Sequence, residues 1–366
     1  MISLSCNCEP IVLLSDLLLR VRASGDMGVS EDALRAVIEI PEGALSRTIQ
    51  LAHKHHVVIR ALEPLCSLMA VAGKEAYAAR LTHVIRDERT RVRAAFSSLE
   101  KVCDELRAHG CPAVVMKSLD HWPDLGNDLD LFVDANPAEV VRLMRDHLGA
   151  DIEPRSWGDR MAHKWNFALP DLRELVETHI GRLGQTGEHV RFGQSLLANA
   201  RIETFDSSRF LVPAPEHRII LATLQRMYRH FYLRLCDVMN TAKLVESGSL
   251  DYRALEFSAR DAGIWQGVAS YLIIVSDYVR SFRGKELPLP AVVRAAACVR
   301  GGAISFRRDF LRIPILSQSV QLYFAEMRSF LHRRDLTGSL RLSLLPCLAT
   351  AAVLGQKFTG SDKGVW

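Results

Sequence analysis

The chain has 366 residues, which is long enough for two or three domains. Hydrophobic residues make up 48% and charged residues 24%, an ordinary composition for a soluble globular protein. The formal net charge is only +4 and the arginines are scattered, so we find no concentrated basic patch of the kind that follows nucleic-acid phosphates. This disfavours a nucleic-acid partner without excluding one.

The cysteines and the apolar stretches are typical of a cytoplasmic protein. None of the eight cysteines forms a CxxC pair, and no nearby residues complete a zinc site around Cys6 and Cys8. The amino terminus lacks a charged region ahead of an apolar core, so it is not expected to be a signal peptide. The late apolar stretch SLLPCLATAAVLG contains Pro346 and is too short to cross a bilayer. We expect a cytoplasmic location and no membrane span.

Residues 1–88 are predicted to be helical. One helix is expected to begin at Ser30, and a later helical stretch to break near Pro64 and near Gly73. A long helix is expected from about residue 79 to 109, ending at Gly110. Its apolar residues step by four and three along one face, at Val92, Phe96, Leu99, Cys103 and Leu106.

The pattern changes at residue 111. PAVVM and DLDLFV are typical of strands, PAEVVRLMRDHLG of a helix, and KWNFAL and RELVETHI of a hairpin. The helical pattern returns from about Pro213 and continues to the end of the chain, with TGSDKGVW as a loose tail. The predicted fold class is therefore α+β, a small mixed sheet flanked by helical segments. We expect helices over 1–88, a core over 89–190, helices over 191–300 and a helical extension over 301–366.

Two acidic residues interrupt the second of these strands. Asp128 and Asp130 are two residues apart, so on a strand they point to the same side, while Leu129 and Leu131 point to the other. Adjacent carboxylates repel each other, and a divalent cation such as Mg²⁺ relieves that repulsion. Glu177 interrupts the apolar pattern of RELVETHI in the same way and is a candidate third ligand. The alternative is a solvated strand face that binds no metal.

Several motifs together resemble a known family. They are Met116-Lys117-Ser118, then Asp128-Leu129-Asp130-Leu131-Phe132-Val133, then Glu177-Thr178-His179, with a later RLCDV helix. In this combination the sequence resembles the polymerase-β-like nucleotidyltransferases, and among them the branch known as uncharacterised nucleotidyltransferases. The likeness covers roughly residues 40–300. The sequence departs from the pattern where Ser118 replaces a glycine and where SLDHWPDLG lacks an arginine.

The resemblance implies a nucleotidyltransferase core and transfer assisted by two Mg²⁺ ions, or by Mn²⁺. Asp128, Asp130 and Glu177 would be the catalytic metal ligands. Ser118 would hold terminal phosphates, and Lys117 would contact phosphate unless strand alternation aims it outward. Arg229 or Arg234 would meet phosphate, or else lie with His230 and Asp237 on a solvated helix face. His179 would orient Glu177, touch the nucleotide or serve only the structure.

The implied function is transfer of a nucleotidyl, or related phosphate-linked, group from a nucleoside triphosphate or other nucleotide donor. The acceptor is expected to be a small molecule or a peptide, as in the tailoring of peptide natural products. Two alternatives stay open. One is a nucleotidyltransferase-like toxin that modifies tRNA or protein, and the other is a non-catalytic interaction module that retains the fold. We further expect the Asp128 strand to pair with the strand that ends at Met116, to lie near the Glu177 strand, and to face a cleft.

Overall fold

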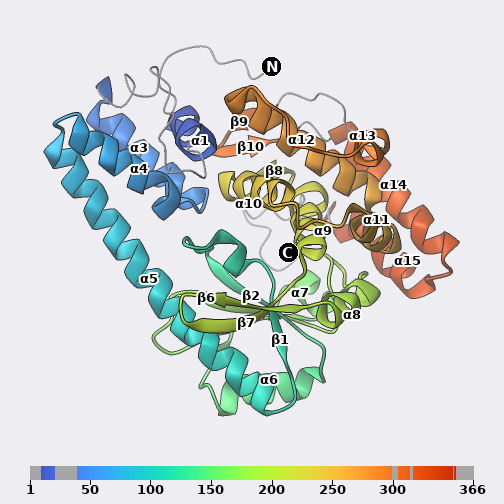
Figure 1. The fold of residues 1–366 in the computed structure, drawn as a ribbon. Helices are drawn as coiled ribbons and strands as arrows, with labels where there is room; N and C mark the ends of the chain where they lie inside the picture. The colour runs from blue at the N-terminus through green and yellow to red at the C-terminus, as the bar shows by residue number, and fades with distance from the viewer. Residues whose placement is uncertain (1–9, 21–38, 299–303, 314–315, 349, 352–366) are drawn as a thin grey trace.

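The structure is a computed structural model that describes residues 10–20, 39–298, 304–313, 316–348 and 350–351. It is a mixed α+β protein with a small mixed sheet, as predicted (Figure 1). The helix expected at Ser30, the pair Cys6 and Cys8, and the tail TGSDKGVW lie outside the described residues. Among the described residues, no helix is both long enough and apolar enough to cross a membrane.

The N-terminal helices are α1 (Pro10–Arg20), α3 (Glu42–Lys54) and α4 (Val58–Val71). The predicted break near Gly73 is confirmed, since Gly73 has a φ of 71° and follows the end of α4. The predicted break near Pro64 is wrong, because α4 runs through this proline. Burial explains this: Leu62 and Leu65 on either side of Pro64 are fully buried, and their packing offsets the lost backbone hydrogen bond.

The long helix α5 spans Glu75–Ala108 and carries the predicted apolar face. Every residue of that face, from Val92 to Leu106, is buried against the sheet. The predicted boundary between residues 88 and 89 falls inside this uninterrupted helix. In Figure 1, α5 runs from the N-terminal helices down to the sheet, so it connects these two parts of the molecule.

The sheet has five strands in the order β1-β2-β5-β4-β3. Their bounds are β1 (Ala113–Val115), β2 (Asp128–Val133), β3 (Asp151–Ile152), β4 (Lys164–Ala168) and β5 (Leu175–Ile180). β2 pairs antiparallel with β1 and parallel with β5, and β4 pairs antiparallel with β5. The predicted pairing of the Asp128 strand and the predicted hairpin are therefore confirmed. β3 was not predicted.

The two faces of the sheet pack against different cores. Leu129, Leu131 and Val133 belong to a core shared with α5 and with α6 (Pro137–Asp146), which is capped by Asn136. Phe132 points the other way, toward α8 (Val190–Ala198), where a Cβ on Gly193 would lie 2.6 Å from the Phe132 ring. The face that carries Asp128 and Asp130 is therefore the one turned toward the helical part of the chain.

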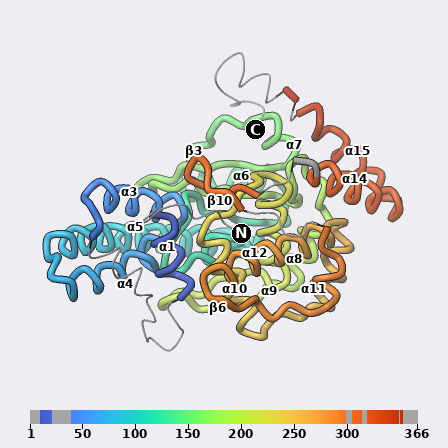
Figure 2. The backbone as a smooth tube through the Cα atoms, turned by 90° about the horizontal axis from the view of Figure 1, so that it is seen from above, coloured from blue at the N-terminus to red at the C-terminus, as the bar shows by residue number. Residues whose placement is uncertain are grey.

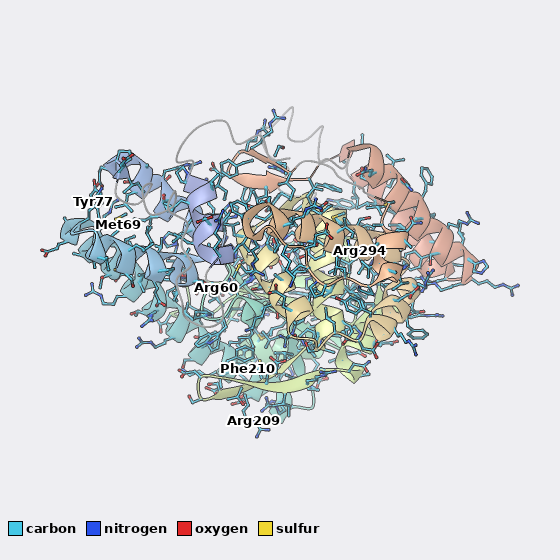
Figure 3. The ribbon with its side chains drawn as sticks, turned by 45° about the horizontal axis from the view of Figure 1, so that its top comes forward. Arg60, Met69, Tyr77, Arg209, Phe210 and Arg294 are labelled. Carbon is cyan, nitrogen blue, oxygen red and sulfur yellow. The ribbon has the colours of Figure 1, made fainter. Side chains whose placement is uncertain are left out.

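The short helix α7 (Trp157–Met161) lies between β3 and β4. The C-terminal part is helical with short strands. Its elements are the hairpin β6 (Arg201–Phe205) and β7 (Ser208–Val212), α9 (Pro215–Thr223), the π-helix η2 (Leu224–His230), β8 (Tyr232–Leu233), α10 (Leu235–Glu246), α11 (Tyr252–Asp261), α12 (Trp265–Arg283), α13 (Ala291–Ala296), β9 (Ser305–Arg307), β10 (Phe310–Arg312), α14 (Leu316–His332) and α15 (Leu336–Ser343). The hairpin β6–β7 was not predicted. On β7, Phe210 is buried against α5 while Arg209 is exposed and points outward (Figure 3).

Segments distant in the sequence share the helical core. α1 packs against α12 and α10, so the first described helix lies among the C-terminal helices. α14 and α15 lie at the edge of the molecule opposite α3 and α5 (Figures 1 and 2). The chain therefore begins in the helical core, builds the sheet, and returns to the helical core.

The predicted single helix that carries Arg229, His230, Arg234 and Asp237 is wrong. η2 ends at His230, and the next residue, Phe231, has a φ of 55° and a left-handed conformation. β8 then separates η2 from α10. A bulky residue in this region of backbone space is an outlier. The break places Arg229 at the end of one helix and Arg234 at the N-cap of the next.

Candidate functional site

A pocket separates the sheet from the helical part of the chain. Its walls come from the sheet, from the turn after β1, and from the segment between η2 and α10. It encloses about 740 Å³ of space, its open mouth included. The residues that line it include the predicted Lys117, Ser118, Asp128, Asp130, Glu177 and Arg234. His179, the last predicted residue, lines the adjoining cavity.

The carboxylates of Asp128, Asp130 and Glu177 form one wall of this pocket because of the strand register, and we call it the carboxylate pocket. In the parallel pair β2–β5, Asp130 is the direct neighbour of Glu177. Asp128 lies two residues earlier on β2, so all three side chains share one face of the sheet. Asp128 is exposed and Asp130 is partly buried, and both line the pocket.

Lysines neutralise two of the three carboxylates. Lys117 Nζ lies 2.7 Å from Asp130 Oδ1, so the Lys117 side chain turns into the pocket. Lys164 Nζ lies 3.0 Å from Glu177 Oε2 and 2.8 Å from Asp159 Oδ1. Asp128 forms no ion pair with any residue that the structure describes, so its carboxylate is the one open to a ligand.

Burial and charge separate the three acids. Asp128 is exposed, but the protein around its carboxylate still removes part of its hydration and raises its pKa, and the nearby Glu177 raises it further. Burial also raises the pKa of Asp130, against the opposing effect of Lys117. Burial opposes charge on Glu177 as well, but the His179 hydrogen bond and the Lys164 ammonium outweigh it and hold the pKa of Glu177 well below its usual value. The pKa values of Asp128 and Asp130 are therefore shifted in the opposite direction to that of Glu177.

Ser118 supports the acidic strand through its hydroxyl. The Oγ accepts from the Asp130 N–H at 2.8 Å and donates to the Asp128 carbonyl at 3.3 Å. The residue is almost fully buried. The hydroxyl predicted to hold phosphates is therefore bonded to the backbone that positions the two aspartates.

Three arginines form the opposite wall of the pocket. Arg226 and Arg229 come from the π-helix η2, and Arg234 lies at the N-cap of α10. Arg226 is fully buried and its Nε lies 2.7 Å from Asp237 Oδ2. The wide turn of a π-helix often occurs at functional sites, and here it precedes the left-handed Phe231. Sequence reasoning identified Arg229, Arg234 and Asp237 but missed Arg226, since a helical pattern gives no sign of a π-turn.

Two histidines in the pocket wall were also missed. The amide oxygen of Asn240 accepts from Arg60, so its Nδ2 donates to Nδ1 of His121 at 3.0 Å. This arrangement leaves the proton of a neutral His121 on Nε2. Burial lowers the pKa of His121 to about 3, and it also lowers the pKa of the neighbouring His56. Both rings are therefore neutral at physiological pH, and they line the pocket as hydrogen-bonding groups.

His179 lies beside Glu177 rather than inside the carboxylate pocket. Its Nε2 is 3.1 Å from Glu177 Oε1. Together with Lys164, it fixes the orientation of the Glu177 carboxylate. This contact is consistent with the expectation that His179 orients Glu177.

The donor set fits a hard divalent cation, because Mg²⁺ prefers carboxylate oxygens. In this arrangement Asp130 is drawn toward Lys117 and Glu177 toward Lys164. Among the described residues, Asp128, Asp130 and Glu177 do not all bring their ligand atoms within 4.8 Å of one another. Three other groups do so: His56–His121–Cys236, Glu105–His109–His147 and Glu188–His189–Glu326. A cation at Asp128 and Asp130 would take the place of the Lys117 ammonium.

Comparison of the chain with models of protein families, with curated proteins and with solved structures gave no match.

Proposed function

We propose that this protein is a Mg²⁺-dependent nucleotidyltransferase that moves a nucleotidyl group from a nucleoside triphosphate to a small-molecule or peptide acceptor. One observation carries the proposal. A single pocket sets three carboxylates on adjacent strands against three arginines from η2 and α10. Acids that suit a metal and arginines that suit phosphates are the two halves of a site for a metal–triphosphate complex.

The charge distribution supports this division of labour. Arg226 is already paired with Asp237, whereas Arg229 and Arg234 have no acidic partner among the residues that the structure describes, so their guanidinium groups are the ones we assign to a ligand. Guanidinium groups bind phosphate oxygens with two parallel hydrogen bonds. The neutral His121 would add an Nε2–H donor. Asp128, Asp130 and Glu177 would hold Mg²⁺, which neutralises phosphate charge and lowers the pKa of an acceptor hydroxyl.

In the proposed reaction, the acceptor oxygen attacks the α-phosphorus of the nucleotide. The new phosphorus–oxygen bond forms as the bond to pyrophosphate breaks, and pyrophosphate leaves with the bonding electrons. The acceptor hydroxyl loses its proton to the carboxylate side of the pocket, where Asp128 has no lysine partner among the described residues. The arginines stabilise the charge that builds on the phosphate oxygens.

A second candidate function has its own supporting observation. Lys117 and Lys164 already balance Asp130 and Glu177 without any metal. This pairing favours a module that binds an anionic ligand through the arginines and performs no chemistry. Such a module would bind nucleotide equally well with and without Mg²⁺.

A thermal-shift titration distinguishes these two functions. A ligand that binds only the folded state raises its melting temperature, by more when it binds more tightly or is more concentrated. We expect Mg²⁺ with a nucleoside triphosphate to stabilise the wild type more than nucleotide alone, and Asp130→Asn to lose this Mg²⁺-dependent part. Asp146→Asn, an exposed acid on α6 outside the pocket, is the matched control and should behave as the wild type. Equal responses of the wild type and Asp130→Asn to Mg²⁺ would overturn the proposal.

A further inference from the structure

A second cavity adjoins the carboxylate pocket and has a different chemical character. It encloses about 670 Å³, its mouth included, and most of its wall is apolar. The apolar side chains come from the segment after β5, from α9 and η2, and from the C-terminal helical hairpin: Leu183, Leu221, Leu224, Tyr228, Leu342 and Leu345. We call this cavity the apolar pocket.

The two pockets share part of their walls. Lys117, Gln225 and Arg229 line both of them. Lys117 contacts Asp130 on one side, and His179, which lines the apolar pocket, contacts Glu177. The π-helix η2 supplies residues to both pockets, with Leu224 and Tyr228 in the apolar pocket and Arg226 in the carboxylate pocket. A molecule in the apolar pocket would therefore reach toward the carboxylates.

The C-terminal hairpin closes this cavity from the outside. Arg341 of α15 donates to the carbonyls of Met161 at 3.0 Å and of Thr186 at 2.8 Å, which docks α15 onto the sheet part of the chain. Leu342 is buried beside it and Leu345 follows. The segment 316–345 therefore forms part of the wall of the apolar pocket.

One polar group in the apolar pocket lacks an aligned partner. Glu326 of α14 is 3% exposed in its side chain, and its Oε1 lies 3.1 Å from His189 Nε2. The contact is out of line for a hydrogen bond, so neither atom has an aligned partner among the described residues. Burial opposes charge on His189, but Glu326 and Glu188 outweigh it and raise the pKa of the ring, which makes the contact a poorly aligned ion pair. Burial raises the pKa of Glu326, as expected for an acid held away from water. A ligand with a donor or a cation would relieve this cost.

The neighbouring Glu188 is already occupied by its own loop. Its carboxylate accepts from the backbone N–H of Gln185 at 3.1 Å and from that of Thr186 at 2.8 Å. Gly184 makes this contact possible, since a Cβ there would lie 2.3 Å from the Glu188 carboxylate and the φ is +95°. Glu188 is thus committed to the turn, which argues against a metal ion shared by Glu188, His189 and Glu326. Glu326, whose contact with His189 is out of line, remains the acid that could accept from a ligand.

We propose that the apolar pocket binds the acceptor, and that this acceptor has an aliphatic or aromatic body and carries an amine that pairs with Glu326. The proposal rests on the proposed function, since an acceptor presupposes transfer. The apolar body packs against the leucines of η2 and α15. The reacting group extends past Lys117 and Gln225 toward Asp128.

Binding of three simple probes to the full chain without nucleotide tests this inference. The probes are n-octylamine, n-octanol and n-octanoate, which share one apolar body and differ in the head group. Calorimetry should show that octylamine binds roughly tenfold or more tightly than octanoate, because a charge-assisted contact with Glu326 favours the ammonium. Glu326→Gln should reduce octylamine affinity to that of octanol. Equal binding of octylamine and octanoate would overturn the proposal.

A filling variant keeps the test decisive if Glu326→Gln unfolds. Leu345→Trp places bulk inside the pocket and should abolish binding of all three probes, whereas Leu340→Trp, on the 68% exposed side of α15, should leave it intact. Octylamine binding that survives Leu345→Trp would place it elsewhere and overturn the inference. Asp130→Asn should keep octylamine binding while it loses the response to Mg²⁺ and nucleotide, so the two proposals fail separately. Octylamine binding without any nucleotide response would overturn the acceptor role.

Discussion

Asp237 anchors the segment that carries the arginines of the pocket. Its carboxylate accepts from the Arg234 backbone N–H at 2.7 Å and lies 2.7 Å from Nε of Arg226. The two side chains are only 6% and 1% exposed. Burial opposes charge on Asp237, but Arg226 and the Arg234 N–H outweigh it and lower its pKa. The pair joins η2 to α10 across the left-handed Phe231.

We predict that Asp237→Ala lowers the free energy of unfolding by about 3–5 kcal/mol, because it leaves Arg226 as an unpaired buried charge. Loss of the bond to the Arg234 N–H adds about 1 kcal/mol, the usual value of a helix cap. Asp237→Asn keeps an acceptor for that N–H, so its loss of unfolding free energy should be about 1 kcal/mol smaller than that of Asp237→Ala. The double variant Arg226→Met/Asp237→Leu should recover most of the loss, since apolar residues replace a buried pair well.

Urea unfolding at neutral pH measures these changes as shifts of the midpoint. The control is Asp277→Ala, which removes a more exposed ion pair with Arg280 at 3.0 Å and should cost less than about 1 kcal/mol. The stabilisation by Asp237 is present above the ordinary Asp pKa of about 3.9 and is lost as the pH falls through its depressed folded-state pKa. A loss for Asp237→Ala no larger than that of the control would refute this reasoning.

Three further perturbations probe the pocket itself. Arg229→Ala should weaken binding of Mg²⁺–nucleotide by about tenfold to a hundredfold in calorimetry, the value of a charge-assisted contact, while the exposed Arg209→Ala should change nothing. Ser118→Ala should lower the free energy of unfolding by about 1–3 kcal/mol, because the buried Asp130 N–H loses its acceptor. If Ser118→Ala instead loses nucleotide binding at unchanged stability, Ser118 contacts phosphate directly. Because the folded-state pKa of Asp130 is raised, the wild type binds more protons when folded, and its stability should fall relative to Asp130→Asn as the pH rises above about 3.9. A melting-temperature difference that does not vary with pH would contradict this assignment.

The sheet and its acids could be predicted because their signals are local. Alternation of apolar and acidic residues placed Asp128 and Asp130 on one face, and the same alternation placed Glu177 on another strand. The turn between β4 and β5 made the hairpin visible in the sequence. Their assembly into one wall follows from parallel pairing of β2 with β5, which the structure shows and the spacing alone does not.

The arginine wall could not be predicted because it depends on a break in a helical pattern. Residues 215–246 have helical periodicity, and no Gly or Pro marks the change at Phe231. Tertiary contacts override propensity there, including the stacking of Tyr232 on Phe310 at 4.2 Å. The ion-pair partners of Lys117 and Lys164 could not be predicted either, because a long flexible side chain can reach several acids and only the folded structure shows which one it contacts.

The most direct test of nucleotidyl transfer follows the two ends of the triphosphate separately. Purified protein would be incubated with Mg²⁺, cell extract and each nucleoside triphosphate, labelled at either the α- or the γ-phosphate. We expect the α-label to move to an acceptor and the γ-label to appear as pyrophosphate, and we expect Asp130→Asn to give neither product. Label in tRNA or protein would assign the acceptor to a macromolecule. Transfer of the γ-label, or no transfer by the wild type with any nucleotide, would contradict the central claim.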